Sequence, residues 1–198
     1  MDKNDFINRI KEAEKNLPQT EEPAFSKEDT TSTTAAAGTP KEAFIRNFTA
    51  NHGNVFESVS ALIQFLKDKG CKRGVADEKL AETFGLENEF ELVRQFDRSN
   101  SDTFDFGISR ASFAVGESGA LVLKDSDTDD RLATIAPWVH IAVLKESDIV
   151  PTIADGLEKT VDCPYAIYVA GPSKTTDVEG VLVEGVHGPG VEICLLVK

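Results

Sequence analysis

The clearest chemical pattern in the sequence is a group of hydroxyl and ammonium side chains close together. It lies in the segment 171–179, which reads Gly-Pro-Ser-Lys-Thr-Thr-Asp-Val-Glu. The candidate anion-binding residues are Ser173, Lys174, Thr175, Thr176 and Asp177, together with Ser118 from a separate turn. Gathered at the start of a helix, such groups and the free backbone N–H groups favour a carboxylate or a phosphate.

A strand, a loop and a helix would position these residues. An apolar run ends at Ala170, and the apolar residues of 178–183 predict a helix from Asp177 to about Gly185. Thr176 and Glu179 have the spacing of a capping box. A capped strand–helix junction without a ligand explains the same residues. The pattern lacks the glycines and the Gly-Lys-Ser/Thr end of a P-loop, so it does not indicate nucleotide hydrolysis.

A histidine in a glycine-rich turn is a second candidate. His187 lies in the segment 184–190, which contains three glycines and Pro189 and leads into a final apolar run. Such a turn can hold an imidazole at a sheet edge for proton transfer or carboxylate binding. A structural loop histidine is the alternative.

The turn 114–119 is the third candidate, with Glu117 and Ser118 at its tip. A hairpin or strand corner explains its glycines, and Glu117 can then be a solvated carboxylate. If Glu117 and His187 share a cleft, they can act as acid and base, and we predict one pocket with Ser173–Thr175. The predicted helix separates its two ends by roughly 12–14 Å. A longer ligand, a neighbouring chain or a purely structural His187 would resolve this separation.

The sequence predicts no metal or cluster site in this chain. Its three cysteines are Cys71, Cys163 and Cys194, and no two have the spacing of a cluster motif, so we interpret them as reduced thiols. The acidic run 124–131 lacks the glycine and glutamate of an EF-hand. His52 and His140 have no sequence neighbour that suggests a metal site.

Charge and hydropathy exclude other classes of function. The net charge of −13 opposes binding to nucleic acids or anionic membranes. No apolar run approaches the roughly 18–20 residues of a membrane span. The first residues lack the basic start and apolar core of a secretion signal, so a cytoplasmic location is expected.

The pattern of predicted elements indicates an α/β fold. Continuous apolar runs at 119–123, 139–144, 165–170 and 191–197 predict buried strands, and helical periodicity separates them. A mixed or largely parallel sheet flanked by helices follows. Residues 1–40 are expected to form an N-terminal helix and a flexible polar arm, and residues 41–198 the folded domain.

Five segments, taken in order, resemble the LUD domain of the lactate utilization protein C family. They are DFGIS at 105–109, AVGESGALVL at 114–123, PWVHIAV at 137–143, GPSKTTDVE at 171–179 and EGVHGP at 184–189. The last two segments together make the resemblance specific. Gly116 and Ser118 depart from the alanine and threonine that are usual in this family, although Ser118 keeps the hydroxyl.

The resemblance implies a fold similar to the sugar-phosphate isomerase and CoA-transferase group. It also implies a non-redox subunit that works beside iron–sulfur subunits in the oxidation of lactate to pyruvate. The candidate anion-binding residues add the hypothesis that this subunit binds a small organic anion. The clusters are then expected in the partner subunits, because this chain also lacks a G-x-G-x-x-G fingerprint. The alternatives are a free-standing isomerase or transferase acting on a phosphate- or CoA-bearing substrate, and a non-catalytic interaction module.

Overall fold

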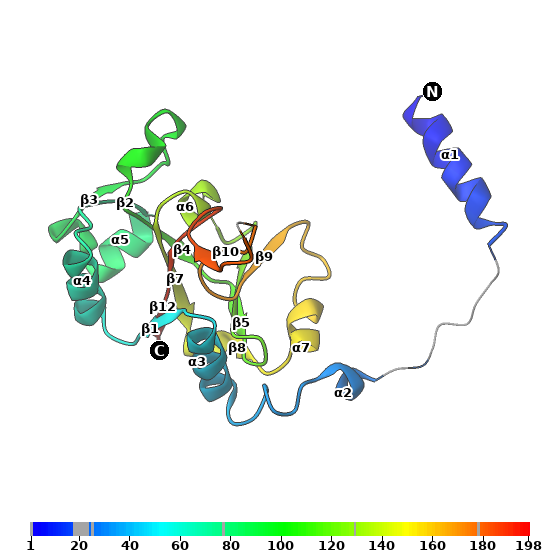
Figure 1. Cartoon of the computed structure of the whole chain (residues 1–198), viewed down its shortest axis with the longest axis horizontal. Coiled ribbons are helices and arrows are strands. Elements are labelled where there is room, and N and C mark those ends of the chain that lie inside the picture. Colours follow the sequence, from blue (N-terminus) through cyan, green and yellow to red (C-terminus); the bar gives the residue numbers. More distant parts are fainter. Residues whose placement is uncertain (1, 18–23, 25, 77, 129, 178) are drawn as a thin grey trace.

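A computed structural model describes residues 2–17, 24, 26–76, 78–128, 130–177 and 179–198. Its centre is a six-stranded sheet in the order β1-β12-β7-β4-β2-β3, and every neighbouring pair is parallel (Figure 1). The strands are β1 (Asn54–Phe56), β2 (Arg73–Ala76), β3 (Glu91–Val93), β4 (Phe106–Arg110), β7 (Val139–Lys145) and β12 (Val191–Val197). The predicted α/β class with a largely parallel sheet is confirmed.

Helices connect these strands along the chain. The connecting segments are helical because their apolar residues recur at helical spacing. The helices of the body are α3 (Pro40–Ala50), α4 (Val59–Asp68), α5 (Glu78–Phe84), α6 (Leu132–Ile135) and α7 (Ile153–Glu158). Short 3-10 turns span Leu86–Asn88, Arg98–Thr103 and Glu146–Asp148. In α4, Leu62 and Leu66 are one turn apart and buried, and the Ser58 side chain caps the first turn. The chain leaves this helix at Gly70, whose φ of +77° suits glycine.

A second sheet covers one face of the parallel sheet. Its strands are β8 (Ile149–Val150), β5 (Phe113–Val115), β6 (Ala120–Lys124) and β9 (Ala166–Val169), in that spatial order. They pair antiparallel except β5 with β8. The strands predicted at 119–123 and 165–170 are both present as β6 and β9, but both belong to this second sheet, and β9 is only partly buried.

The two faces of the parallel sheet have different cores. Ile141 and Ile193 pack with α4 and α5 on one face. Leu144 and Cys194 pack with α3 and the second sheet on the other. Because both faces are covered, β7 and β12 are apolar almost throughout, as is typical of parallel strands.

The part of the N-terminal arm around Ala35 and Ala37 is hydrogen bonded to the body. The predicted first helix is α1 (Lys3–Glu14), which has no buried residue and lies apart from the body, and α2 (Lys27–Thr30) follows it (Figure 1). Residues 18–23 and 25 of the predicted arm lie outside the described residues. The Arg46 guanidinium donates to the carbonyls of Ala35 and Ala37 at 2.6 and 2.9 Å, which fixes this part of the arm against α3. Within the described ranges, no helix is long and apolar enough to span a membrane.

Candidate functional site

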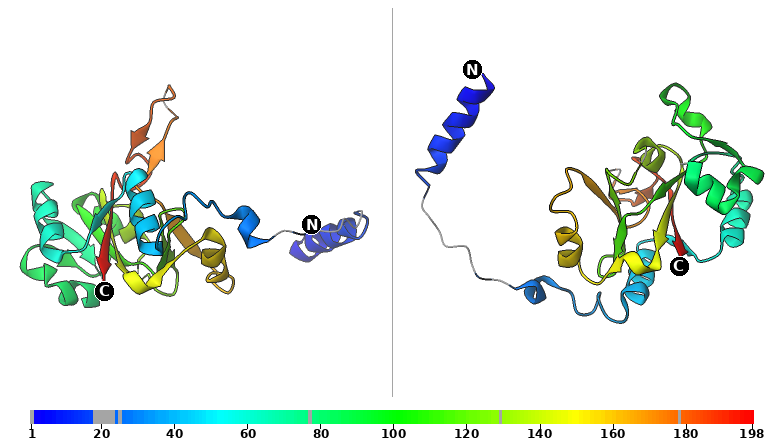
Figure 2. Two further views of the ribbon diagram at one scale, coloured as in Figure 1. Left: turned by 90° about the horizontal axis from the view of Figure 1, so that it is seen from below. Right: turned by 180° about the vertical axis from the view of Figure 1, so that it is seen from behind.

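The segment predicted to begin a helix forms a hairpin instead. Strands β10 (Lys174–Thr175) and β11 (Val183–Glu184) pair antiparallel and project from the body (Figure 2). The predicted helix from Asp177 to Gly185 is therefore wrong, although its residue Val178 lies outside the described residues. Without that helix, Thr176 has neither a helix dipole nor a capping box that would favour binding of an anion.

The backbone angles and the exposure of its side chains explain why this segment forms a hairpin. Glu179 and Gly180 both have positive φ, 54° and 71°, which reverses the chain where a helix would have continued. Val181 and Leu182 are 60% and 52% exposed, so the apolar residues of this segment do not pack on the body. An amphipathic helix derives most of its stability from such packing.

The hairpin places the segments of Ser173 and His187 side by side. The Ser173 backbone donates to the Pro189 carbonyl at 2.9 Å and accepts from the Gly185 backbone at 2.9 Å. The expected separation of these segments along a helix is therefore wrong as well. His187 Nε2 lies 3.8 Å from Asp177 Oδ2, and both side chains are mostly exposed, so solvent screens this pair.

Lys174 holds the hairpin to the end of α3. Its Nζ donates to the Asn51 carbonyl at 2.5 Å and lies 4.0 Å from Glu184 Oε1. Glu184 Oε1 is also 2.5 Å from His52 Nδ1. The lysine therefore has two acceptors within the protein before any ligand arrives.

Glu117 is already hydrogen bonded within the protein. It is only 7% exposed, and its two carboxylate oxygens accept from the backbone N–H groups of Ser32 at 2.5 Å and Ile153 at 2.9 Å. Ile153 is the first residue of α7, where a carboxylate also stabilises the helix dipole. The Ser118 carbonyl accepts from Asn51 at 3.4 Å. Both carboxylate oxygens of Glu117 are thus engaged by backbone groups of the protein, and the acid–base roles of Glu117 and His187 stay predictions.

A crevice lies at the carboxyl edge of the parallel sheet, where ligands bind in open α/β folds. We call it the carboxyl-edge crevice. Its walls include the last residues of three strands, Arg110 of β4, Lys145 of β7 and Val197 of β12, with Asp127 and Asp148 nearby. Its volume is about 370 Å³, within the range of small-molecule sites. Among the described residues, neither the Arg110 guanidinium nor the Lys145 ammonium has a hydrogen-bond or ion-pair partner.

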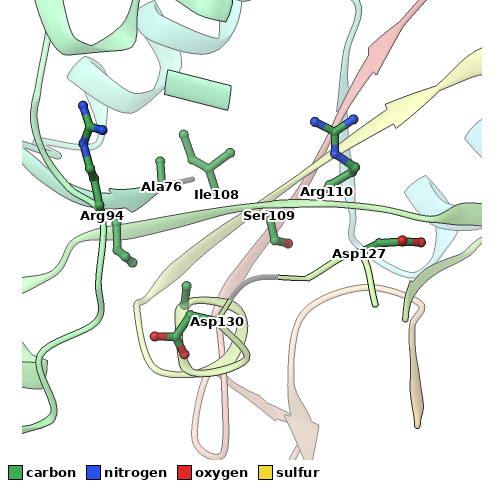
Figure 3. Close-up of a pocket in the computed structure, with 9 residues that line it drawn as sticks. Ala76, Arg94, Ile108, Ser109, Arg110, Asp127 and Asp130 are labelled. Carbon is green, nitrogen blue, oxygen red and sulfur yellow. The ribbon is translucent and has the colours of Figure 1, made fainter. Parts of the chain in front are cut away.

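A smaller cavity adjoins this crevice on the other side of β4. Its volume is about 20 Å³, and its walls include Ser109, Asp130 and Ala133. Arg110 and Asp127 line both spaces. Ser109 points from the strand toward the loop that carries Asp130, whereas Arg110 points to the opposite side (Figure 3).

Comparison with known proteins identifies the family. The sequence profile of the LUD domain matches residues 41–197. The chain belongs to the LUD domain family. Lactate utilization protein C of Bacillus subtilis is 35% identical over 100 residues, which are 46% of this chain and 42% of that protein. Lactate utilization protein C of Anoxybacillus flavithermus is 32% identical over 127 residues, 58% of each chain.

This LUD domain also has a similar solved structure. A DUF162 family protein from Deinococcus radiodurans superposes with a TM-score of 0.60 and 19% identity, covering 81% of this chain and 99% of that chain. The likeness shows a shared fold. The chain's match spans about half the length of the curated relatives.

Sequence reasoning missed a buried polar trio in the LUD domain. Ser109 Oγ lies 2.7 Å from His140 Nε2, and His140 Nδ1 lies 2.7 Å from Glu192 Oε1. The signal was present, since His140 and Glu192 are polar residues inside apolar strands. What the sequence could not show is that β7 lies between β4 and β12 and brings the three side chains together.

The role of Glu117 can be tested by its removal. Glu117→Ala is expected to lower the free energy of unfolding by about 1.5–3 kcal/mol, because two backbone N–H groups lose a charged acceptor. Urea unfolding measures this, with Ser118→Ala in the same turn as the control that should remain near wild type. Wild-type stability combined with lost lactate oxidation in the assembled system would instead support the catalytic role.

Proposed function

We propose that this LUD domain acts in lactate utilization as a cluster-free subunit beside iron–sulfur partner subunits that oxidise lactate to pyruvate. The family assignment supports the proposal, since curated relatives across their matched regions are named lactate utilization protein C. The partners, the substrate and a cytoplasmic location are parts of this proposal, because the match spans about half of those relatives.

The cysteines support the cluster-free part of the proposal. Cys71 and Cys194 are buried free thiols, and burial raises the pKa of both. A raised pKa disfavours the thiolate, which is the form that binds iron. The redox centres that lactate oxidation requires are therefore assigned to the partner subunits.

The carboxyl-edge crevice supports binding of a small organic anion. Arg110 can hold a carboxylate through two parallel hydrogen bonds, and Lys145 adds a second positive charge. Asp127 and Asp148 line the same space and oppose an additional negative charge. This balance favours a ligand with one carboxylate and a neutral polar group, as in a 2-hydroxy or 2-keto acid.

Reconstitution tests the function. The full chain and its partner subunits are combined, and L-lactate-dependent dye reduction is measured with and without this chain. We expect the rate to fall at least about tenfold when the chain is left out, because the ligand then loses its binding site. Iron and acid-labile sulfide analysis should find no stoichiometric cluster in the isolated chain.

Two results would contradict the proposal. One is lactate oxidation that is undiminished without this chain, and the other is a cluster bound by the isolated chain. Turnover of a phosphate- or CoA-bearing substrate by the isolated chain would favour the isomerase or transferase alternative.

A further inference from the structure

The carboxyl-edge crevice continues the core that lies between α5 and the parallel sheet. Alternate residues of a strand point to the same face of its sheet. Ile108 of β4 and Val143 of β7 belong to the core on the face that α4 and α5 cover. Arg110 and Lys145 lie two residues further along these strands, so their side chains leave the sheet on that face. The two cations therefore stand at the open end of an apolar core.

The register of the strands places a valine beside each cation. Arg110 is in register with Val143, and Lys145 is in register with Val197 of β12. Neighbouring strands lie about 4.8 Å apart, and alternate residues of one strand about 6.6 Å apart. A carboxylate that is bound at either cation thus has a valine side chain within reach of a short alkyl chain.

Helix α5 forms the facing wall of the crevice with Leu80, Thr83 and Phe84. Leu80 is buried, and Phe84 packs against the core on this face of the sheet. The Thr83 hydroxyl donates to the Lys79 carbonyl at 2.6 Å, so its hydrogen is engaged within the helix. This wall therefore offers a ligand mainly hydrocarbon surface.

Lactate leaves much of this hydrocarbon surface without contact. The crevice has a volume of about 370 Å³, which is in the range of sites that hold ligands much larger than a three-carbon acid. When Arg110 holds the carboxylate of lactate, only the methyl group of the ligand is left to contact the apolar wall. Burial of each further methylene group is favourable, so a longer alkyl chain should gain affinity here.

We propose that the carboxyl-edge crevice binds 2-hydroxy and 2-keto acids whose hydrocarbon chain is longer than the methyl group of lactate, and that Phe84 and Val197 determine this preference. The inference rests on the proposed function, in which Arg110 and Lys145 hold the carboxylate at the same site. The alkyl chain extends from the cations into the space between α5 and the sheet. Lactate is then the smallest member of the substrate class.

The acidic side chains of the crevice restrict this class to monocarboxylic acids. Asp127 and Asp148 line the same space as the apolar wall. A second carboxylate at the far end of the ligand would lose its hydration and meet charges of the same sign. The crevice therefore selects for a neutral chain as well as for its length.

Calorimetry with a homologous series of ligands tests the inference. The full chain is titrated with L-lactate and with the L-enantiomers of 2-hydroxybutyrate, 2-hydroxypentanoate and 2-hydroxyhexanoate. Complete burial of a methylene group contributes about 0.8 kcal/mol, which is about fourfold in affinity. Because the crevice is open to water on one side, we expect at least about twofold tighter binding for each added methylene group. The dicarboxylate 2-hydroxyglutarate has the chain length of 2-hydroxypentanoate and should bind at least about tenfold more weakly.

Substitutions in the wall show whether the gain arises at this site. Val197→Thr replaces a methyl group with a hydroxyl group and keeps a residue that favours strands, and Phe84→Ala removes the aromatic ring. Each is expected to weaken the binding of 2-hydroxyhexanoate at least about threefold and that of lactate less than about twofold. Because Phe84→Ala also removes a core contact, Val197→Thr keeps the test valid if that variant does not fold. Val161→Thr, at an exposed position outside the crevice, is the matched control and should bind the whole series as wild type does.

The possible outcomes separate this inference from the proposed function. Affinity that rises along the series in wild type, and rises less in the two wall variants, supports both. Lactate that binds at least as tightly as the longer acids contradicts the inference and leaves the proposed function intact, and so does a rise that both wall variants retain. Binding of 2-hydroxyhexanoate without binding of lactate supports the inference and removes lactate as the ligand. If no acid of the series binds, the inference and the anion-binding part of the proposed function are both wrong.

Discussion

Glu192→Ala is expected to lower the free energy of unfolding by about 3–5 kcal/mol, because it leaves the buried His140 without its partner. Glu192→Gln keeps an oxygen that can accept from His140 Nδ1 and should cost far less. Both groups are buried in the structure, so His140 has no direct contact with bulk water that could replace the lost partner. Urea unfolding measures both variants. An Ala variant as stable as wild type would show that the pair contributes little.

The pH dependence of the Gln variant has a defined sign. Burial raises the pKa of Glu192 above its ordinary value of 4.5. The folded protein therefore holds this proton more tightly than the unfolded chain does. That contribution to stability is complete below about pH 4.5 and is lost as pH rises toward the folded-state pKa.

Glutamine has no carboxyl proton to lose, so Glu192→Gln should gain on wild type as pH rises through this window. The slope is about 1.4 kcal/mol for each pH unit at most. Unfolding free energies at steps from pH 4 to pH 8.5 measure it, and Glu87→Gln at an exposed position should follow wild type throughout. A difference that does not change with pH would show that Glu192 is ionised throughout, in an ion pair with His140.

The two longest strands of the parallel sheet, β7 and β12, could be predicted because each is a long and nearly continuous apolar run. Helix α4 has apolar residues at helical spacing between Ser58 and Gly70, and β12 is a continuous apolar run. These patterns reflect burial, which the residues themselves encode. They do not encode which strands lie side by side, and for that reason the second sheet was not separated from the first.

The candidate site was less predictable than the fold. The segment 176–183 has both a capping-box spacing and apolar residues, so its sequence is compatible with a helix, although Val181 and Leu182 are exposed in the structure. The buried trio, by contrast, is present in the structure and was not predicted. Ser109, His140 and Glu192 lie far apart in the sequence, and only the strand order makes them neighbours. Arg110 and Lys145 likewise line the same crevice only because β4 and β7 end at the same edge of the sheet.

The second large effect is expected from substitution of Arg110 or Lys145. Arg110→Ala and Lys145→Ala are each expected to weaken the binding of L-lactate about 10- to 100-fold, since a charge-assisted hydrogen bond is lost and such bonds contribute about 1.5–3 kcal/mol. Neither side chain has a partner among the described residues, so stability should change by less than about 0.5 kcal/mol. Calorimetry measures the affinity. Arg98→Ala and Lys72→Ala, at exposed positions outside the crevice, are the matched controls.

Substitution of the carboxylates in the crevice should change the affinity for lactate in the opposite direction. Asp127 and Asp148 line the space with the two cations and repel a bound anion. Asp127→Asn and Asp148→Asn should therefore strengthen lactate binding about two- to tenfold at low salt, and added salt should reduce this gain because it screens exposed charges. Arginine and aspartate variants that change the affinity in opposite directions would place the carboxylate of the ligand in this crevice. Unchanged affinity in all four variants would place it elsewhere, with the hairpin residue Lys174 as the next position to substitute.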